Sequence, residues 1–555
     1  MRDIALRVAV LLAAGLVAAP GSALPLAGDR VWNPDRGDGT YANPVLFADY
    51  SDPDVVRQGD DFYLVSSSFA SVPGLPILHS RDLVNWAIVG HAAPRLPSPD
   101  FDTPQHGKGL WAPSLRHHAG RFWIYVGDPD RGIYVTTATD PRGPWTPLVL
   151  VKPVKGAIDP CPLWDDDGKM YLVHAWAKSR AGFNSILTVT PLSADGLRTD
   201  GKDVQVFDGH ANHPTIEGPK FYKRNGWYYI FAPAGGVATG WQTVLRARSL
   251  FGPYEDRIVM RQGKTDVNGP HQGAWVETKA GESWFMHFQD RGVYGRILHL
   301  QPMVWKDDWP VIGADPDGDG IGEPVPTFRK PVAGAPIATP RTSDEFDSSR
   351  LGLQWQWNAN PSADWTSLSA RPGWLRLASV SRPPSAQSVF DLSAVLLQKT
   401  PAEGFTVTAS IDASGLAVGE RAGLVVMGRD TASIAVHRNA QGLVIVRSTG
   451  RNVDTSGADD EATGATASKD ILPRGVITLR ATFEAGGRVR FDAGTDTMRF
   501  VDPGPGFVAR PGVWVGARVG LFATRQELPG TRVATRGFAD VDWFRVEPYE
   551  SGAHP

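Results

Sequence analysis

One short pattern occurs five times between residues 59 and 287 of this 555-residue chain, and it constrains the fold more than any other feature. Each copy is a glycine followed by a run of aromatic and aliphatic residues: Gly59–Val65, Gly120–Val126, Gly168–Val173, Gly226–Phe231 and Gly281–His287. The copies recur about every 50 to 60 residues, a period typical of the blades of a β-propeller. The repeat therefore predicts a five-bladed propeller over residues 40–313.

A second set of residues precedes the five glycines by seven to ten positions: Asp52, Trp111, Asp159, Glu217 and His271. If the segment before each glycine is the innermost strand of its blade, these side chains converge on the propeller axis. Three carboxylates crowded together cannot all ionise at equal cost, so one pKa should rise. Hydrolysis of a glycosidic bond needs this division between a protonated acid and an ionised carboxylate.

The residues that follow the three acids predict their backbone geometry. Proline follows Asp52 and Asp159, which favours an extended conformation for both acids. Gly218 follows Glu217 and allows another part of the backbone to approach closely. A single Asp-Pro pair is usually a turn, but three acids at equivalent positions of one repeat favour a catalytic interpretation.

The rest of the chain also indicates an all-β protein. Three related segments, His79–Trp86, Thr137–Trp145 and Ala247–Tyr254, are expected at the outer edges of blades. Residues 314–342 are rich in Pro, Gly and Asp and predict a linker or wrapping segment. Strands alternating in polarity over residues 343–549 predict a two-sheet β-sandwich that binds sugar or caps the propeller.

Within the linker, the segment Asp315–Gly320 resembles the first half of a calcium loop. Pro326 stands where the loop needs a glutamate, so a solvated turn is the favoured interpretation.

Composition excludes several classes of function. A net charge of -3 favours neither nucleic acid nor an anionic membrane as a partner. The single cysteine, Cys161, rules out an intrachain disulfide and is best interpreted as a small buried residue. The 19 tryptophans exceed what the core needs, and exposed indole faces commonly bind sugar rings.

The N-terminus predicts a signal peptide over residues 1–23. Arg2 and Arg7 precede an apolar stretch, Val8–Ala19, and the small residues Gly21-Ser-Ala23 follow it. The apolar stretch is too short to span a bilayer. We therefore expect export, to the periplasm or the medium.

Nine fragments resemble family 43 of the glycoside hydrolases, in the branch of β-xylosidases and α-L-arabinofuranosidases. They are Asn43–Leu46, Tyr50–Val55, Val65–Phe69, Pro73–Trp86, Leu110–Ser114, Ile158–Pro160, Ile216–Pro219, Gly269–Gly273 and Tyr294–Ile297. The last 200 residues resemble the concanavalin A-like sandwich that accompanies the xylosidase branch. Together these segments cover nearly the whole mature chain.

The resemblance implies an inverting enzyme that needs no cofactor. Asp52 would be the general base and Glu217 the general acid, with Asp159 raising the pKa of Glu217 and orienting it. The Asp52 and Glu217 carboxyls should then lie roughly 6.5 to 9.5 Å apart, which leaves room for the attacking water.

The resemblance also implies residues that bind the substrate. Arg296 would contact sugar hydroxyls, while Phe69 and Trp111 would wall the site. Some family members hold a calcium ion on the axis, so His271 is either a metal ligand or a hydrogen-bonding neighbour of the site.

Several functions remain open at this level. The leading one is an exo-1,4-β-xylosidase acting on xylo-oligosaccharides, with α-L-arabinofuranosidase activity on arabinoxylan or arabinan as the alternative or second activity. An endo-acting arabinanase or a retaining fructan-cleaving enzyme fits less well. A non-catalytic carbohydrate-binding propeller would have no reason to keep the three acids together.

Overall fold

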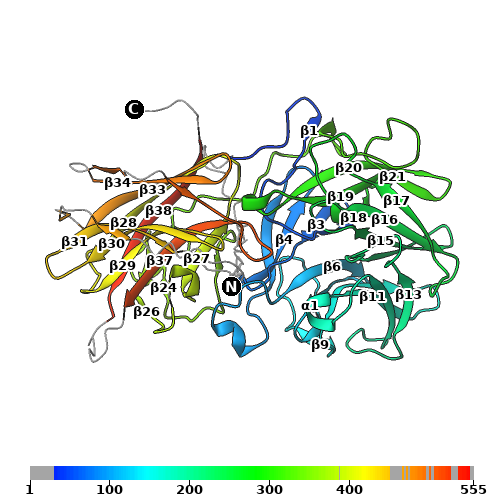
Figure 1. The fold of residues 1–555 in the computed structure, drawn as a ribbon, viewed down its shortest axis with the longest axis horizontal. Coiled ribbons are helices and arrows are strands. Elements are labelled where there is room, and N and C mark those ends of the chain that lie inside the picture. The colour runs from blue at the N-terminus through cyan, green and yellow to red at the C-terminus, as the bar shows by residue number, and fades with distance from the viewer. Residues whose placement is uncertain are drawn as a thin grey trace, which may run out of the picture.

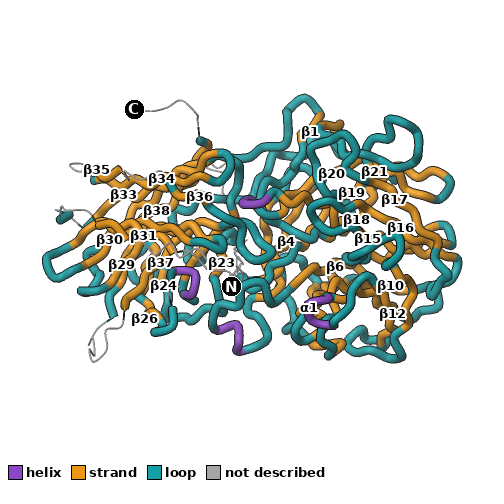
Figure 2. Tube along the Cα trace, in the orientation of Figure 1, coloured by secondary structure: helices purple, strands orange, loops and turns teal. Residues whose placement is uncertain are grey.

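The computed structural model describes residues 31–386, 388–450, 465–467, 471–472, 475–495, 499–501, 506–526 and 536–549. The signal peptide predicted over residues 1–23 lies outside them. The described residues form two β-rich domains that lie side by side (Figures 1 and 2). Their only helical segments are α1 (Lys178–Ala181) and 3₁₀ turns at Pro99–Asp102, Gly292–Tyr294 and Val389–Asp391.

The first domain is the predicted five-bladed propeller, in which each blade is a sheet of four consecutive antiparallel strands. Blades 1 and 2 are β2 (Asp54–Gln58), β3 (Asp61–Val65), β4 (Gly74–Ser80), β5 (Ala87–Ala93), β6 (Trp111–His118), β7 (Arg121–Asp128), β8 (Gly132–Ala138) and β9 (Val149–Lys152). Blades 3 and 4 are β10 (Ala157–Trp164), β11 (Met170–Trp176), β12 (Ile186–Leu192), β13 (Val204–Asp208), β14 (Lys220–Arg224), β15 (Trp227–Ala234), β16 (Trp241–Ala247) and β17 (Glu255–Met260). Blade 5 is β18 (His271–Glu277), β19 (Ser283–Asp290), β20 (Arg296–Lys306) and β21 (Trp309–Ile312).

The aromatic repeats form the second strand of each blade because both faces of that strand are covered by neighbouring blades. Between blades 3 and 4, for example, Val173 and Val189 share a core with Ile230 and Leu245. The second repeat lies at the outer edge, as predicted: Trp86 is fully buried and its indole N–H donates to Leu83 O at 2.8 Å.

The ring is closed by segments from both ends of the domain. Strand β1 (Thr40–Ala42) pairs with β22 (Thr327–Arg329), so part of the predicted linker is a strand. Asn43 Nδ2 donates to Leu300 O and Val325 O, each at 2.8 Å. The linker therefore wraps back across the junction of blades 1 and 5.

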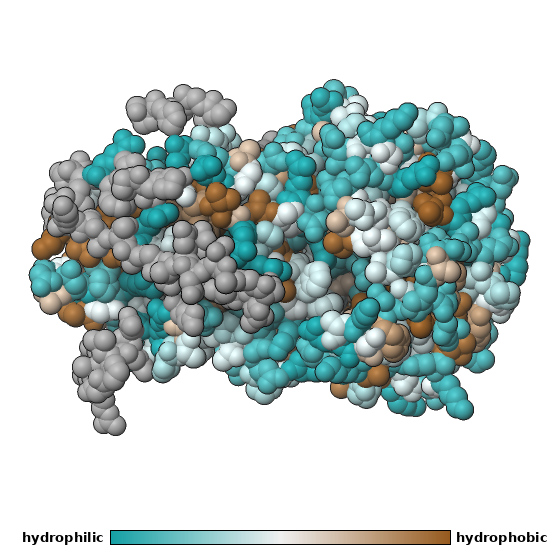
Figure 3. All heavy atoms as spheres, viewed as in Figure 1, coloured by the Kyte–Doolittle hydropathy of each residue, from teal (hydrophilic) through white to brown (hydrophobic). Residues whose placement is uncertain are grey.

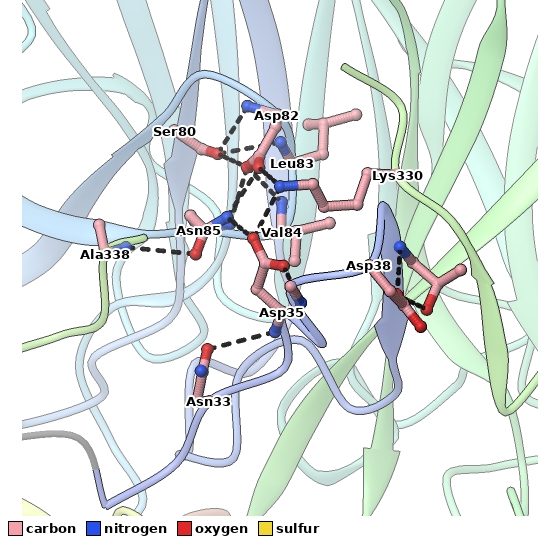
Figure 4. Close-up of polar contacts among 12 residues, drawn as sticks. Asn33, Asp35, Asp38, Ser80, Asp82, Leu83, Val84, Asn85, Lys330 and Ala338 are labelled. Atoms are coloured by element: carbon pink, nitrogen blue, oxygen red, sulfur yellow. Dashed lines mark hydrogen bonds and ion pairs between the residues drawn. The ribbon is translucent and has the colours of Figure 1, made fainter. Parts of the chain in front are cut away.

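A buried ionic cluster holds this wrapping segment against blade 1 (Figure 4). Lys330 Nζ lies 2.7 Å from Asp35 Oδ2 and 3.4 Å from Asp82 Oδ2. Burial alone would raise the pKa of Asp35, but hydrogen bonds from Lys330 and Asn85 outweigh it and lower that pKa. Asn85 Oδ1 also accepts from Ala338 N at 3.2 Å, which fixes the next part of the linker.

The second domain is a sandwich of two sheets, as predicted. The first sheet contains β23 (Gln356–Trp357), β27 (Val395–Lys399), β37 (Arg518–Gln526), β29 (Glu420–Met427), β30 (Thr431–Arg438), β31 (Leu443–Gly450) and β32 (Ala465–Ala467), with β26 (Val380–Arg382) beside β37. The second contains β24 (Thr366–Ser367), β25 (Leu375–Ala378), β38 (Phe538–Pro548), β28 (Phe405–Asp412), β33 (Val476–Glu484), β34 (Arg488–Gly494) and β35 (Arg499–Val501), with β36 (Phe507–Val508) beside β34. Alternating residues such as Leu424 and Ile434 meet Val407 and Leu479 in the core between the sheets.

Hydrogen bonds cross directly from the propeller to the sandwich. Val72 and Trp357 form a two-way backbone bridge, with N–O distances of 3.0 and 2.5 Å. Asn360 N donates to Phe101 O at 2.7 Å, and Asn360 Oδ1 accepts from Leu96 N at 2.8 Å. On the face shown in Figure 3, hydrophobic residues form separate small patches among hydrophilic ones on both domains.

Candidate active site

The five residues singled out by the repeat lie where the innermost strands begin. Trp111 and His271 are the first residues of β6 and β18, and Asp159 lies near the start of β10. Asp52 and Glu217 lie in the few residues that lead into β2 and β14. Strands β18, β2, β6, β10 and β14 contact one another in this order, and β18 also contacts β15 of blade 4. The five candidate residues therefore lie at equivalent positions, where the inner strands begin.

Asp52 is held by two donors and is only 3% exposed. Arg296 Nη1 lies 3.0 Å from Oδ1 and 3.4 Å from Oδ2 of Asp52. Ser67 Oγ donates to Oδ2 from the other side at 2.5 Å. The carboxylate is thus fixed in one orientation, as a base that must align a water requires.

Asp159 is the carboxyl whose environment most disfavours charge. Burial raises its pKa well above the ordinary 3.8, and the nearby charges of Glu217 and Asp52 raise it further. Gly218 N donates to Asp159 Oδ2 at 2.8 Å. A Cβ at residue 218 would lie 2.7 Å from Gln272 Cγ, so the close approach at Gly218 is that of a side chain and not of backbone as predicted. The φ of 58° at this residue also favours glycine.

Glu217 differs from the two aspartates because its side chain is 33% exposed. His271 Nε2 lies 3.1 Å from Glu217 Oε1, while the imidazole itself is fully buried. Glu217 can therefore reach a bound molecule while His271 orients it from behind. In the described residues His271 Nδ1 has no hydrogen-bond partner.

The prediction of extended backbone at Asp52 and Asp159 is wrong. Their φ angles are 55° and 56°, in the left-handed region that is uncommon for residues other than glycine. At Asp159 the register shifts between Ile158 and Cys161, which marks a β-bulge. A bulge at the start of the inner strand turns the carboxyl, and such strained backbone is frequent at functional sites.

Arg296 contacts Asp52, and Phe69 and Trp111 lie close to each other, while their role as walls of the site stays a prediction. The ring centroids of Phe69 and Trp111 are 6.1 Å apart. Arg296 is 9% exposed and ion-paired with Asp52, so its proposed contact with sugar hydroxyls stays a prediction.

Sequence reasoning missed Trp514, which reaches this site from the sandwich. Its ring centroid lies 6.0 Å from that of Trp111, and the Arg296 guanidinium carbon lies 5.9 Å from it. Trp514 is 50% exposed and has a φ of 64°. A tryptophan that is exposed, in strained backbone and beside the acids is well suited to contact a sugar ring.

Asp49, also missed, connects the Trp514 loop to the catalytic residues. Its Oδ1 accepts from Arg296 N at 3.0 Å, and its Oδ2 accepts from Gly516 N at 2.9 Å. The backbones are so close that a Cβ on Gly516 would lie 2.6 Å from Gly295 N. One buried carboxylate thus joins the sandwich loop to the backbone of the arginine that holds Asp52.

A calcium ion near His271 stays a prediction. Calcium takes six to eight oxygen ligands, and in the described ranges only Asp315, Asp317 and Asp319 group three acidic or histidine ligands. His271 offers one buried nitrogen and no such group. The side chains on the axis therefore do not form a calcium cage, and we derive no step through a metal.

The raised pKa of Asp159 leads to a prediction about stability. Its contribution to folding is full below the unfolded pKa and is lost as pH rises through the higher folded pKa. Asp159→Asn should therefore raise the free energy of unfolding at about pH 8, and the gain should shrink toward about pH 4. Denaturant unfolding at both pH values measures this, and lower stability of the variant at pH 8 would contradict it.

The activity of Asp159→Asn should still fall, by about 10²-fold, because the pair of carboxyls formed by Glu217 and Asp159 is lost.

Two segments of the chain match known families. Residues 41–310 match glycosyl hydrolases family 43, and residues 343–547 match the β-xylosidase C-terminal concanavalin A-like domain. A family 43 protein from Bacillus licheniformis has a similar crystal structure, with a TM-score of 0.78 and 26% identity. That similarity covers 92% of this chain and all of the other.

The similar sequences include proteins named β-xylosidase and a protein named α-L-arabinofuranosidase. A putative β-xylosidase from Xylanibacter ruminicola is 49% identical over 344 residues, which cover 62% of this chain and 63% of that protein. A β-xylosidase from Formosa agariphila is 32% identical across 96% of this chain and 94% of its own length. A non-reducing end α-L-arabinofuranosidase from Bacteroides ovatus is 30% identical across 91% and 94%.

Proposed function

Because this chain belongs to family 43 of the glycosyl hydrolases, we propose that it is an inverting exo-1,4-β-xylosidase acting on xylo-oligosaccharides. The proposal rests on the positions of Asp52, Asp159 and Glu217, which lie where three inner strands begin. Two relatives named β-xylosidase support the choice of substrate.

In the proposed mechanism each acid has a separate task. Asp52, oriented by Arg296 and Ser67, accepts a proton from the water that attacks the anomeric carbon. Glu217 gives its proton to the departing glycosidic oxygen as the bond to the anomeric carbon breaks. Because the pKa of Asp159 is raised, the three carboxyls do not all ionise at neutral pH, and the cluster of Asp52, Asp159 and Glu217 retains a proton. The configuration at the anomeric carbon is inverted.

The position of Trp514 supports cleavage at a chain end. The sandwich loop that carries it is bonded to the propeller, since Ala517 N donates to Val293 O at 2.7 Å and Gly516 N donates to Asp49. An aromatic side chain held there obstructs one side of the site. We therefore assign the sandwich a role in shaping the site, and propose no separate sugar-binding role for it.

Removing the Trp514 ring should weaken substrate binding. Trp514→Ala is expected to raise KM by about 3- to 10-fold with a smaller change in kcat, since an aromatic contact is worth about 0.5–1.5 kcal/mol. Steady-state kinetics on xylobiose measure the two constants. Trp374→Ala removes a sandwich indole that stacks on Arg371 and serves as the control. An unchanged KM for Trp514→Ala would exclude contact with the substrate.

An α-L-arabinofuranosidase is the second candidate, because the Bacteroides ovatus relative with that name aligns along nearly the whole chain. Both sugars are pentoses that present similar hydroxyls to a small site. Hydrolysis of 4-nitrophenyl β-D-xylopyranoside and α-L-arabinofuranoside by the purified protein separates the two. Faster turnover of the xyloside is the expected result, and turnover of neither substrate would contradict both.

Export of the protein is a further part of the proposal, supported by the signal-like residues 1–23. None of the helices among the described residues is long and apolar enough to cross a membrane. Mass spectrometry of the N-terminus of protein recovered from cells and medium tests the cleavage after Ala23.

A further inference from the structure

A cavity lies between the two domains, behind the segment that leads to Asp52. The propeller contributes Tyr50 and His91, the sandwich contributes Gln398 and Lys399, and the linker residues 338–342 form another side. The bond from Ala338 N to Asn85 and the Asp35–Lys330 pair hold the linker and N-terminal walls in place (Figure 4). The cavity is therefore built by segments that are fixed independently of it.

Lys399 is the most unusual residue of this cavity. In the part of the chain that the structure describes, its ammonium has no hydrogen bond or ion pair, and lies 5.1 Å from the Tyr50 ring centroid. Burial lowers its pKa, and the charge of Asp49 offsets this only in part. Lys399 is half-buried, and partial burial of an unpaired charge costs stability.

Two further polar groups around Lys399 have no hydrogen-bond partner among the described residues. The Tyr50 hydroxyl and the His91 imidazole have no hydrogen bond there, although both residues line the cavity. Burial, with the charge of Lys399, lowers the pKa of His91 to about 3, so His91 is neutral at physiological pH. Burial raises the pKa of Tyr50, which keeps its hydroxyl protonated.

The chemistry of these groups selects a type of ligand. The described lining contains Lys399 and Arg341 and no Asp or Glu, and the lysine and the Tyr50 hydroxyl both donate. The rest of the wall is mainly apolar, with side chains such as Val45 and Ile88. The cavity volume is about 50 Å³, and one water needs about 10–15 Å³. A ligand of roughly five heavy atoms fits this space.

We propose that this cavity binds a small monocarboxylate with a short apolar tail, whose carboxylate accepts from Lys399 and Tyr50. Such a ligand contacts both domains at once, so it stabilises their association and raises the unfolding temperature of the full chain. The site is separate from the carboxylate-lined active site, where a second carboxylate would be repelled.

Titration with sodium propionate, against sodium chloride at equal ionic strength, tests the proposal. We expect saturable binding by calorimetry and a matching rise in unfolding temperature. Lys399→Met should weaken binding by about 10-fold or more, because it removes the charged donor. Without ligand, Lys399→Met should unfold at a higher temperature than the natural chain, so loss of binding cannot be attributed to misfolding.

Two control variants locate the binding. Lys279→Met removes an exposed lysine paired with Asp60 and should leave propionate binding unchanged. Glu217→Ala should also bind propionate normally, since it alters only the active site. Absence of saturable binding, or equal affinity in Lys399→Met, would overturn the proposal. Binding lost in Glu217→Ala would place the anion in the active site and overturn it as well.

Discussion

Asp52→Asn is expected to lower kcat/KM by about 10²- to 10⁴-fold on every substrate, because the amide cannot take a proton from the attacking water. The loss should be equally large for xylobiose and for 4-nitrophenyl β-D-xylopyranoside, since both reactions need the same water. The amide oxygen can still accept from Arg296, which keeps the structure close to the natural one.

The matched control for this substitution is Asp60→Asn. Asp60 is an exposed aspartate of the same blade, paired with Lys279, and its replacement should leave activity unchanged. A variant of Asp52 that retained a tenth or more of the natural activity would exclude Asp52 as the base.

Glu217→Ala should show a different pattern that depends on the leaving group. On xylobiose, kcat should fall by about 10²- to 10⁴-fold, because the departing sugar hydroxyl needs a proton. On 4-nitrophenyl β-D-xylopyranoside the fall should be much smaller, since a nitrophenolate departs with little assistance from an acid. Steady-state rates on both substrates measure the difference.

Glu255→Ala provides the control, since Glu255 lies in the same blade, contacts Arg246 and is 60% exposed. It should behave as the natural enzyme on both substrates. Equal losses on the two substrates in Glu217→Ala would show that Glu217 does not act as the acid. Comparison with Asp52→Asn is the sharpest internal test, because only one of the two substitutions should depend on the leaving group.

The fold and the three acids could be predicted because both follow from a local pattern repeated along the chain. Each glycine and aromatic run specifies one turn and one doubly covered strand. The position of Asp52, Asp159 or Glu217 relative to that strand then places each acid at the same end of the axis. Repetition supplies information that a single Asp-Pro pair lacks.

The geometry of the acids could not be predicted in the same way. Proline at 53 and 160 favours extended backbone for the preceding residue, yet both acids have positive φ angles. Tertiary contacts decide the outcome: Arg296 and Ser67 hold Asp52, and Gly218 N holds Asp159. A local preference is small compared with several hydrogen bonds to a buried carboxylate.

Capping of the propeller by the sandwich was among the predictions, but the residues that contact the site could not be identified from the sequence. Trp514 lies more than 400 residues from Trp111 in the chain, and nothing distinguishes it from the other tryptophans. Asp49 likewise lies in none of the motifs that the sequence analysis identified. Only the docking of the two domains shows that one carboxylate joins Gly516 to Arg296.

The most direct test of the mechanism is proton NMR of xylobiose hydrolysis in its first minutes. The proposed direct attack of water, with Asp52 as base and Glu217 as acid, predicts that the xylose unit from the non-reducing end is released as the α anomer. The share of α-D-xylose should therefore first exceed its equilibrium value and then fall by mutarotation. If the share of β-D-xylose first exceeded its equilibrium value, the reaction would retain configuration. A retaining reaction needs a nucleophile in place of a base, and would contradict the role given to Asp52.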